Sequence, residues 1–297
     1  MLAIGGCDLA TLEVAVPVGD QVVVEASAVL TVDPTDASRS TTHLLAIMTR
    51  YPDGEPAHAV HGASVRVTGE SSRSVQLSEE PDPAADCVTR EFFRGSCYRS
   101  TAPTSIFAPG ERLFLEVVLP DGGVVRGVSR MPGTFSAVGL SLEDGRCRLT
   151  PDTNYRFNWA PVAGAAAYIA EIGVGGVGGL DVDDRTSWVV PFVGGNMTEL
   201  VFPRALNTWL LDVELARILH TGLPQGAVAD FALGAVDLNW TNWIREGRIN
   251  LNGEVRVPSV FGDGTGWFGT AMRWRVHVES RPSSGDGDLP LCGPPVD

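Results

Sequence analysis

Short runs of alternating apolar and polar residues, separated by turn-forming residues, dominate this chain. The run Gln21–Val32 and the late run Gly266–Glu279 both follow this rule. A period of two is typical of a β-strand with one buried face, whereas a helix would repeat every 3.6 residues. Turn sequences such as Pro120-Asp121-Gly122 divide the runs at short intervals. Antiparallel strands joined by such turns predict an all-β protein.

The length and the distribution of tryptophan indicate two domains. A chain of 297 residues suits two domains of about 130 to 150 residues. All seven tryptophans lie in the second half, which places a boundary near residues 136–148. We therefore expect two tandem antiparallel β-sandwiches, at 10–140 and 147–280, after a short leader at 1–9. Short helices are expected at 210–220 and 238–246, and an irregular tail at 281–297.

The cysteines indicate an oxidising compartment. Apart from Cys7, the chain has Cys87, Cys97, Cys147 and Cys292, an even set that suits disulfides. Three pairings are possible, and the one we prefer joins Cys87 to Cys97 and Cys147 to Cys292. Four reduced thiols packed as small apolar side chains are the alternative. The spacing of the cysteines and histidines does not indicate zinc.

The segment Ile4-Gly5-Gly6-Cys7 has the small residues that precede the cleavage site of a bacterial lipoprotein signal. The site of the protease is narrow, and two glycines allow the extended chain to enter it. We expect a lipid on Cys7, with the basic and apolar parts of the signal upstream of Met1; a chance cysteine is the alternative. Asp8 resembles the signal that retains some lipoproteins at the inner membrane, which predicts the periplasmic side of that membrane.

The charge and the hydropathy exclude several classes of partner. The formal net charge is −14, and all 22 basic residues are arginine. An acidic surface repels nucleic acid and anionic lipid headgroups, so neither is expected as a partner. Apolar runs are no longer than a strand, which leaves the lipid on Cys7 as the expected membrane attachment.

Two parts of the chain resemble known sandwich families. Phe157-Asn158-Trp159-Ala160-Pro161, followed by Tyr168-Ile169-Ala170, resembles the opening of a fibronectin type III domain, a relative of the immunoglobulin fold. Val65, Val67 and Pro109-Gly110-Glu111 are similar to the transthyretin-like or carboxypeptidase-regulatory-like sandwich. Together with Cys7, the whole chain resembles a family of bacterial lipoproteins often encoded beside outer-membrane receptors. That resemblance implies an accessory or ligand-presenting role and supplies no catalytic residue.

Gly173, Gly175 and Gly178 satisfy the spacing GxGxxG after an expected strand. In a nucleotide-binding unit, such glycines let backbone amides approach a pyrophosphate at the start of a helix. Here a run with three aspartates follows instead of a helix, and carboxylates repel phosphate. We therefore interpret these glycines as a hairpin tip.

Asp181, Asp183 and Asp184 are candidate calcium ligands, because oxygen donors on a flexible loop suit that ion. Solvated carboxylates of a turn are the alternative. His58 and His61 lie beside a strand, three positions apart. On an extended chain such side chains point to opposite faces, which disfavours joint metal binding. No other cofactor is expected.

Trp240, Trp243 and Ile244 would share one face of a helix. Large aromatic side chains are favoured at partner interfaces, and packing in the core of the second sandwich is the alternative. Because the sequence lacks the GxSxG and HExxH motifs, we expect no enzyme.

The sequence therefore predicts a lipid-anchored, non-catalytic scaffold or accessory subunit that docks on a membrane protein complex. One alternative is a surface lipoprotein that binds carbohydrate, peptide or an outer-membrane receptor. A hydrolase whose active-site residues form no recognisable motif is the second alternative.

Overall fold

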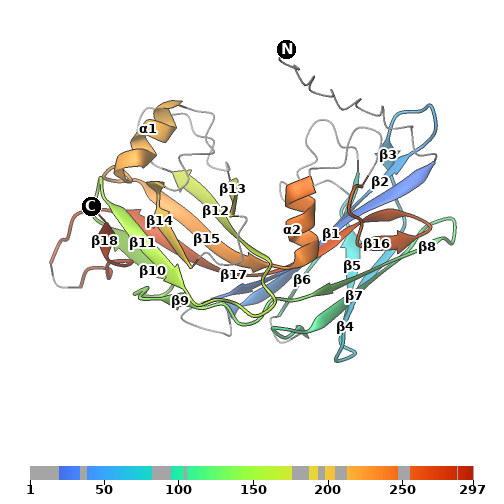
Figure 1. Cartoon of the computed structure of the whole chain (residues 1–297), viewed down its shortest axis with the longest axis horizontal. Coiled ribbons are helices and arrows are strands. Elements are labelled where there is room, and N and C mark those ends of the chain that lie inside the picture. The colour runs from blue at the N-terminus through green and yellow to red at the C-terminus, as the bar shows by residue number, and fades with distance from the viewer. Residues whose placement is uncertain are drawn as a thin grey trace, which may run out of the picture.

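A computed structural model shows two β-rich halves that share one long strand, β17 (Thr265–Ser280) (Figure 1). The structure describes residues 20–33, 39–81, 95–103, 106–175, 187–192, 198–204, 213–246, 255–285 and 287–296. Neither helix in these ranges has the length and apolar character that crossing a bilayer requires.

The first half is a closed β-barrel of nine strands. With β17, its strands are β1 (Gln21–Val32), β2 (Thr41–Tyr51), β6 (Ser96–Pro103), β5 (Ser74–Glu79), β4 (Ser64–Gly69), β7 (Arg112–Val118), β8 (Val124–Arg130) and β16 (Val260–Gly262), in spatial order. The two-residue strand β3 (His58–Ala59) pairs with β2 at one end. Closure comes from a parallel pairing between β1 and the first ten residues of β17, with Val23 opposite Thr265 and Val32 opposite Trp274.

Alternation along the strands fills the interior of the barrel. On β7, Leu113, Leu115 and Val117 are buried, whereas the residues between them reach the surface to different degrees. The β7–β8 hairpin turns where Gly122 takes a φ of 89°, a left-handed conformation that glycine adopts without a steric penalty. Apolar side chains of the described strands therefore occupy the interior of the barrel.

The second half is built around the last part of β17. Its other elements are β9 (Ala137–Val138), β10 (Arg146–Leu149), β11 (Asn154–Trp159), β12 (Ala167–Gly175), β13 (Ser187–Phe192), β14 (Glu199–Phe202), α1 (Val213–Thr221), β15 (Val228–Val236), α2 (Leu238–Glu246) and β18 (Pro295–Val296). The order β17-β15-β12-β13 extends the barrel sheet, with β10 on the opposite edge of β17. A separate sheet with the order β14-β11-β18, to which β9 adds, packs on it through aromatic side chains.

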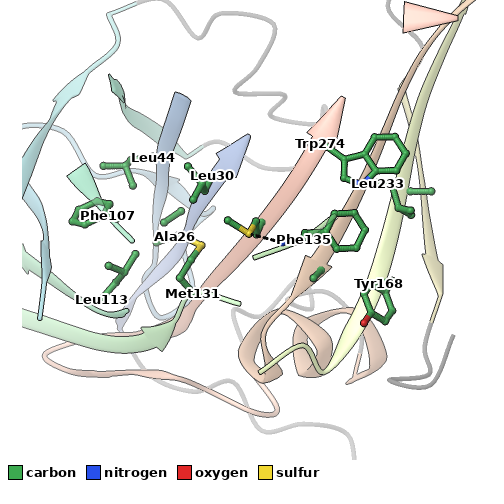
Figure 2. Packing of buried hydrophobic residues seen from close by; sticks show 14 of the residues in the cluster. Ala26, Leu30, Leu44, Phe107, Leu113, Met131, Phe135, Tyr168, Leu233 and Trp274 are labelled. Carbon is green, nitrogen blue, oxygen red and sulfur yellow. Dashed lines mark hydrogen bonds between the residues drawn. The ribbon is translucent and has the colours of Figure 1, made fainter. Parts of the chain in front are cut away.

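One hydrophobic cluster extends through both halves. In the second half, the Phe231 ring lies 5.1 Å from that of Phe157 and 5.7 Å from that of Trp274. Figure 2 shows the junction, where the Phe135 N–H donates to Met272 Sδ at 3.2 Å. Met272 is on β17, so the strand that closes the barrel also contributes to the packing of the second half.

The predicted pair of tandem sandwiches, with immunoglobulin-like and fibronectin-like folds, is wrong. The strands are mainly antiparallel and the two short helices are present, but the first half closes into a barrel. Closure pairs β1 with β17, so that Glu25 and Trp267, 242 positions apart, lie opposite each other. Alternation within a strand shows which face is buried and carries no information about a partner so distant in sequence.

The predicted disulfide between Cys147 and Cys292 is confirmed, and it holds the C-terminal segment against β10. Cys97 is also disulfide-bonded, but Cys87, its predicted partner, lies outside the described residues. Beside the Cys147–Cys292 disulfide, Asp288 pairs with Arg148 at 3.0 Å and with Arg281 at 2.9 Å. The tail is therefore attached covalently and electrostatically.

Candidate interaction surfaces

Large apolar side chains are exposed along one part of the barrel wall, and we call Phe114, Val128, Leu238 and Phe261 the apolar strip. Their exposed fractions are 39%, 50%, 61% and 60%. Phe114 and Val128 lie directly opposite each other on β7 and β8. Phe261 faces Arg126, two residues from Val128 on the same side of β8. Exposed large apolar side chains grouped on neighbouring elements are typical of a protein contact.

Leu238, at the first position of α2, is held against the barrel wall by its neighbour Asn239. The Asn239 side-chain amide donates to the carbonyl oxygens of Val128 and Phe268, each at 2.9 Å. It thereby bridges β8 and β17. A cavity of about 340 Å³ opens here, bordered by Val128 and Leu238 and by Arg112 and Arg130, and it forms a depression beside the strip.

Asp237 fixes the start of α2 at the floor of this depression. Its carboxylate accepts hydrogen bonds from Ser129 Oγ at 2.6 Å, the Trp240 N–H at 3.0 Å and the Thr270 N–H at 3.1 Å. The bond to Trp240 is an N-cap, which satisfies a donor that has no partner within the helix. Burial raises the pKa of Asp237, although these hydrogen bonds partly oppose the effect. The carboxylate therefore holds the position of Leu238.

The predicted interface residues Trp240, Trp243 and Ile244 are half-buried on α2, outside both the barrel and the core of the second half. Trp240 and Ile244 pack on the outer face of β17 and β15. The Trp243 ring stacks on that of Trp267 at 4.7 Å. These side chains attach α2 to the sheet; a role in partner binding stays a prediction.

Glu25 lies at the edge of this tryptophan cluster, on the outer face of β1. Trp267 Nε1 donates to its carboxylate at 3.4 Å. Burial raises the pKa of Glu25, and the indole hydrogen bond opposes the shift only in part. Burial, with a smaller contribution from the charge of Glu25, also raises the pKa of Tyr51 to about 12. The charge of Glu25 thus disfavours ionisation of Tyr51.

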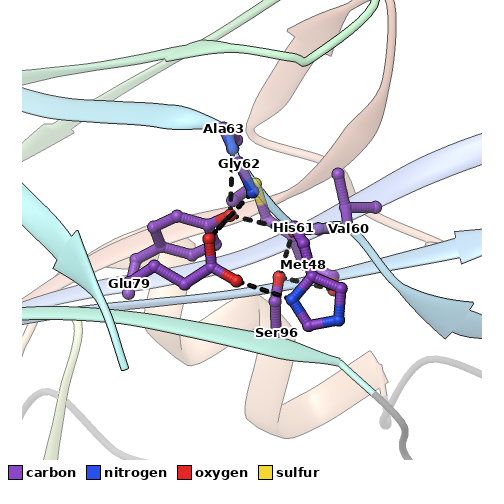
Figure 3. Close-up of polar contacts among 8 residues, drawn as sticks. Met48, Val60, His61, Gly62, Ala63, Glu79 and Ser96 are labelled. Atoms are coloured by element: carbon purple, nitrogen blue, oxygen red, sulfur yellow. Dashed lines mark hydrogen bonds and ion pairs between the residues drawn. The ribbon is translucent and has the colours of Figure 1, made fainter. Parts of the chain in front are cut away.

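A polar cluster occupies one end of the barrel (Figure 3). Glu79 accepts from the Gly62 N–H at 2.8 Å and from Tyr98 Oη at 3.1 Å, and it pairs with His61 Nδ1 at 2.6 Å. Burial would raise the pKa of Glu79, but these hydrogen bonds outweigh it and lower the pKa. The cluster attaches the segment around His61 to β5 and β6.

His58 and His61 both border one cavity of about 200 Å³, together with Arg50 and Asp121. A shared cavity lining does not show which way the two side chains point, so the expectation that they face apart stays a prediction. Within the described ranges, no three histidine, cysteine, aspartate or glutamate side chains form a group that would hold a metal ion.

Other predicted positions lie outside the described residues. These are Cys7, the calcium candidates Asp181, Asp183 and Asp184, and Gly178 of the GxGxxG pattern. Gly173 and Gly175 lie on β12 itself. Lipid attachment and calcium binding therefore stay predictions.

No protein-family model matches this chain, and no curated protein does. Sequence reasoning missed the apolar strip, although a signal was available. Leu113 and Leu115 point inward, so Phe114 between them occupies an outward position where a polar residue is usual. Val128 is likewise an apolar residue at an outward position of β8, where a polar residue is usual.

Proposed function

We propose that this protein is a non-catalytic accessory subunit that docks on a membrane protein at the extracytoplasmic face of a bacterial membrane. The observation that carries the proposal is the apolar strip with its adjoining depression. Four exposed apolar side chains on neighbouring strands and a helix start favour a protein surface over solvent. The charged row Arg66–Glu116–Arg126 crosses the same wall in line with Phe261 and would add polar contacts to such an interface.

The compartment is part of the proposal. The Cys147–Cys292 disulfide favours an oxidising environment, and the spacing at Ile4-Gly5-Gly6-Cys7 provides a lipid attachment site. A tether raises the effective concentration of the strip at the membrane, so a moderate interface is sufficient for docking. Because one acyl chain holds a protein only weakly, contacts through the strip and the lipid together would provide stable attachment.

Site-specific photocrosslinking tests the docking. A photoreactive phenylalanine analogue replaces Leu238 or Phe261 in the chain expressed in its own host. Val138 on β9, which is 54% exposed and outside the strip, is the matched control. We expect crosslinking of one integral membrane protein from Leu238 and Phe261 and none from Val138. Equal crosslinking from all three positions, or none from the strip, would show that the strip is not an interface.

A second measurement tests the tether separately. Cys7→Ser should move the protein from the membrane fraction to the soluble extracytoplasmic fraction, and the intact mass of the wild-type protein should include acyl chains. If the wild-type mass shows an unmodified cysteine, the lipid is wrong, while docking through the strip can still be judged from the crosslinks.

A further inference from the structure

The depression beside the apolar strip has charged groups at its border as well as apolar ones. Val128 and Leu238 supply apolar surface, and Arg112 and Arg130 supply guanidinium groups. Apolar contacts favour many partner segments alike, whereas charged groups at the edge of an interface discriminate between them. The charges of the depression therefore indicate which kind of segment it accepts.

Arg112 and Arg130 lie directly opposite each other on the antiparallel strands β7 and β8, and both are exposed. Their Cβ atoms are therefore about 5 Å apart on the outer face of the sheet. Like charges in such positions destabilise a sheet. Glu70 accepts from Arg112 Nη2 at 2.6 Å. One carboxylate thus serves two arginines, and its ion pair is with Arg112.

Arg130 is oriented without being neutralised. Its Nη1 atom donates to the carbonyl oxygen of Gly110 at 3.0 Å, and its own carbonyl oxygen accepts from Thr270 Oγ1 at 2.7 Å. Within the described part of the chain, its side chain forms no ion pair. A guanidinium carries five donors in a planar fork, so a neutral acceptor at one nitrogen leaves others for a carboxylate.

Two further carboxylates belong to this region, Asp237 at the floor of the depression and Glu111 just before β7. They are only 5% and 9% exposed. Asp237 accepts from Ser129 Oγ and, with its other oxygen, from two backbone N–H groups. Glu111 accepts from Ser71 Oγ and, with each oxygen, from a backbone N–H. An incoming carboxylate is therefore disfavoured at the floor and favoured at the border, beside Arg130.

We propose that the depression selects a partner segment in which an acidic residue lies beside a large apolar residue. The apolar side chain packs against Val128 and Leu238, and the Asp or Glu carboxylate pairs with Arg130. The inference rests on the proposed docking and adds the chemistry of the segment that docks. Because the chain has a formal net charge of −14, an acidic segment is repelled on average. The pairing with Arg130 therefore sets the register of the complex more than it attracts the partner from a distance.

Two photoreactive positions test the inference in the native host. The phenylalanine analogue at Leu238 marks partner residues at the depression, and mass spectrometry identifies the crosslinked peptide. We expect an Asp or Glu within two positions of the crosslinked residue. The analogue at Phe261 reports docking without altering the depression, because it lies about 14 Å from Arg130, four residues along β8 and one strand across.

Variants of Arg130 are compared with the analogue at Phe261. Arg130→Glu should lower the yield of the crosslink about tenfold, because it places two carboxylates against each other. Arg130→Lys keeps the charge and should lower the yield about threefold or less. Arg156→Glu makes the same change of charge at a half-exposed arginine on β11 and should leave the yield unchanged. Replacing the identified acidic residue of the partner with arginine should restore the yield in Arg130→Glu.

The outcomes separate this inference from the docking itself. If neither position crosslinks to a protein, or if both crosslink to lipid alone, the proposed docking fails and the inference fails with it. If protein crosslinks form but persist in Arg130→Glu, or if the marked peptide has no Asp or Glu within two positions, the inference alone is overturned. An equal loss in Arg156→Glu, or no restoration by the partner's arginine, would also overturn it. Circular dichroism establishes that each variant is folded, and Arg130→Gln replaces Arg130→Glu if the latter is not.

Discussion

Glu25 and Trp267 lie opposite each other on the parallel strands β1 and β17, where Trp267 Nε1 donates to the Glu25 carboxylate at 3.4 Å. Their contact joins the first and last strands of the barrel. It also places a carboxylate in a half-buried aromatic environment, which disfavours its charge. Closure of the barrel and the pH dependence of stability are therefore linked at this pair.

Glu25→Gln should make the protein more stable above the raised pKa of Glu25. Burial raises that pKa in the folded state. Between the ordinary glutamate pKa and this raised pKa, the native state therefore binds more protons than the unfolded state. The stability contributed by this group is present below the ordinary glutamate pKa and is lost as the pH rises through the folded pKa. Glutamine keeps an acceptor for Trp267 and does not titrate.

Urea unfolding followed by tryptophan fluorescence from pH 4 to pH 8 measures this difference. The free energy of unfolding of Glu25→Gln, minus that of the wild type, should increase with pH across the window. Glu55→Gln, at an exposed turn position, is the control. A difference independent of pH would mean that Glu25 titrates alike in the folded and unfolded chains.

Asp237→Ala should destabilise the protein by about 2 to 4 kcal/mol, because it removes an N-cap and leaves the buried Thr270 N–H without its acceptor. Asp237→Asn should lose less, since an amide oxygen still caps the helix. The same unfolding experiment at pH 7 compares the two. Equal losses would indicate that the charge, and not the acceptor, fixes the start of α2.

The sequence identifies strands better than their partners. On β7, the alternation of Leu113 and Leu115 with outward residues predicts both the strand and its buried face. The parallel pairing of β1 with β17 has no local signal, because register is set by side chains that meet only after folding. The division into two domains at 10–140 and 147–280 stays a prediction.

The same limit applies to the candidate sites. The helical spacing of Trp240 and Trp243 correctly places both residues on α2, yet it does not show that α2 packs on β17. Arg273 on β17 donates to Thr31 on β1, 242 positions away. These side chains are neighbours only because the barrel closes, so no motif in the sequence could reveal them.

Gly266→Ala should test closure directly and cost more than 3 kcal/mol. Gly266 has a φ of 146°, and a Cβ there would overlap the carbonyl oxygen of Val24 on β1. Relief requires the two strands to separate, with loss of ladder hydrogen bonds. Gly54→Ala is the control, because Gly54 has a φ of 72° and open space around it; it should cost about 1 kcal/mol. Similar losses in both variants would show that β1 and β17 do not approach this closely.

Replacing both Cys147 and Cys292 with serine should lower the free energy of unfolding by about 4 kcal/mol. The bridge spans 145 positions, and in the chain-entropy model a longer closed loop restricts the unfolded chain more strongly. The ion pairs of Asp288 with Arg148 and Arg281 remain, so the folded tail should keep its place. Guanidinium unfolding of both proteins measures the loss, and limited proteolysis of the tail under native conditions measures its attachment. A loss below 1 kcal/mol would contradict the entropic account, and rapid cleavage after residue 281 would show that the disulfide alone holds the tail.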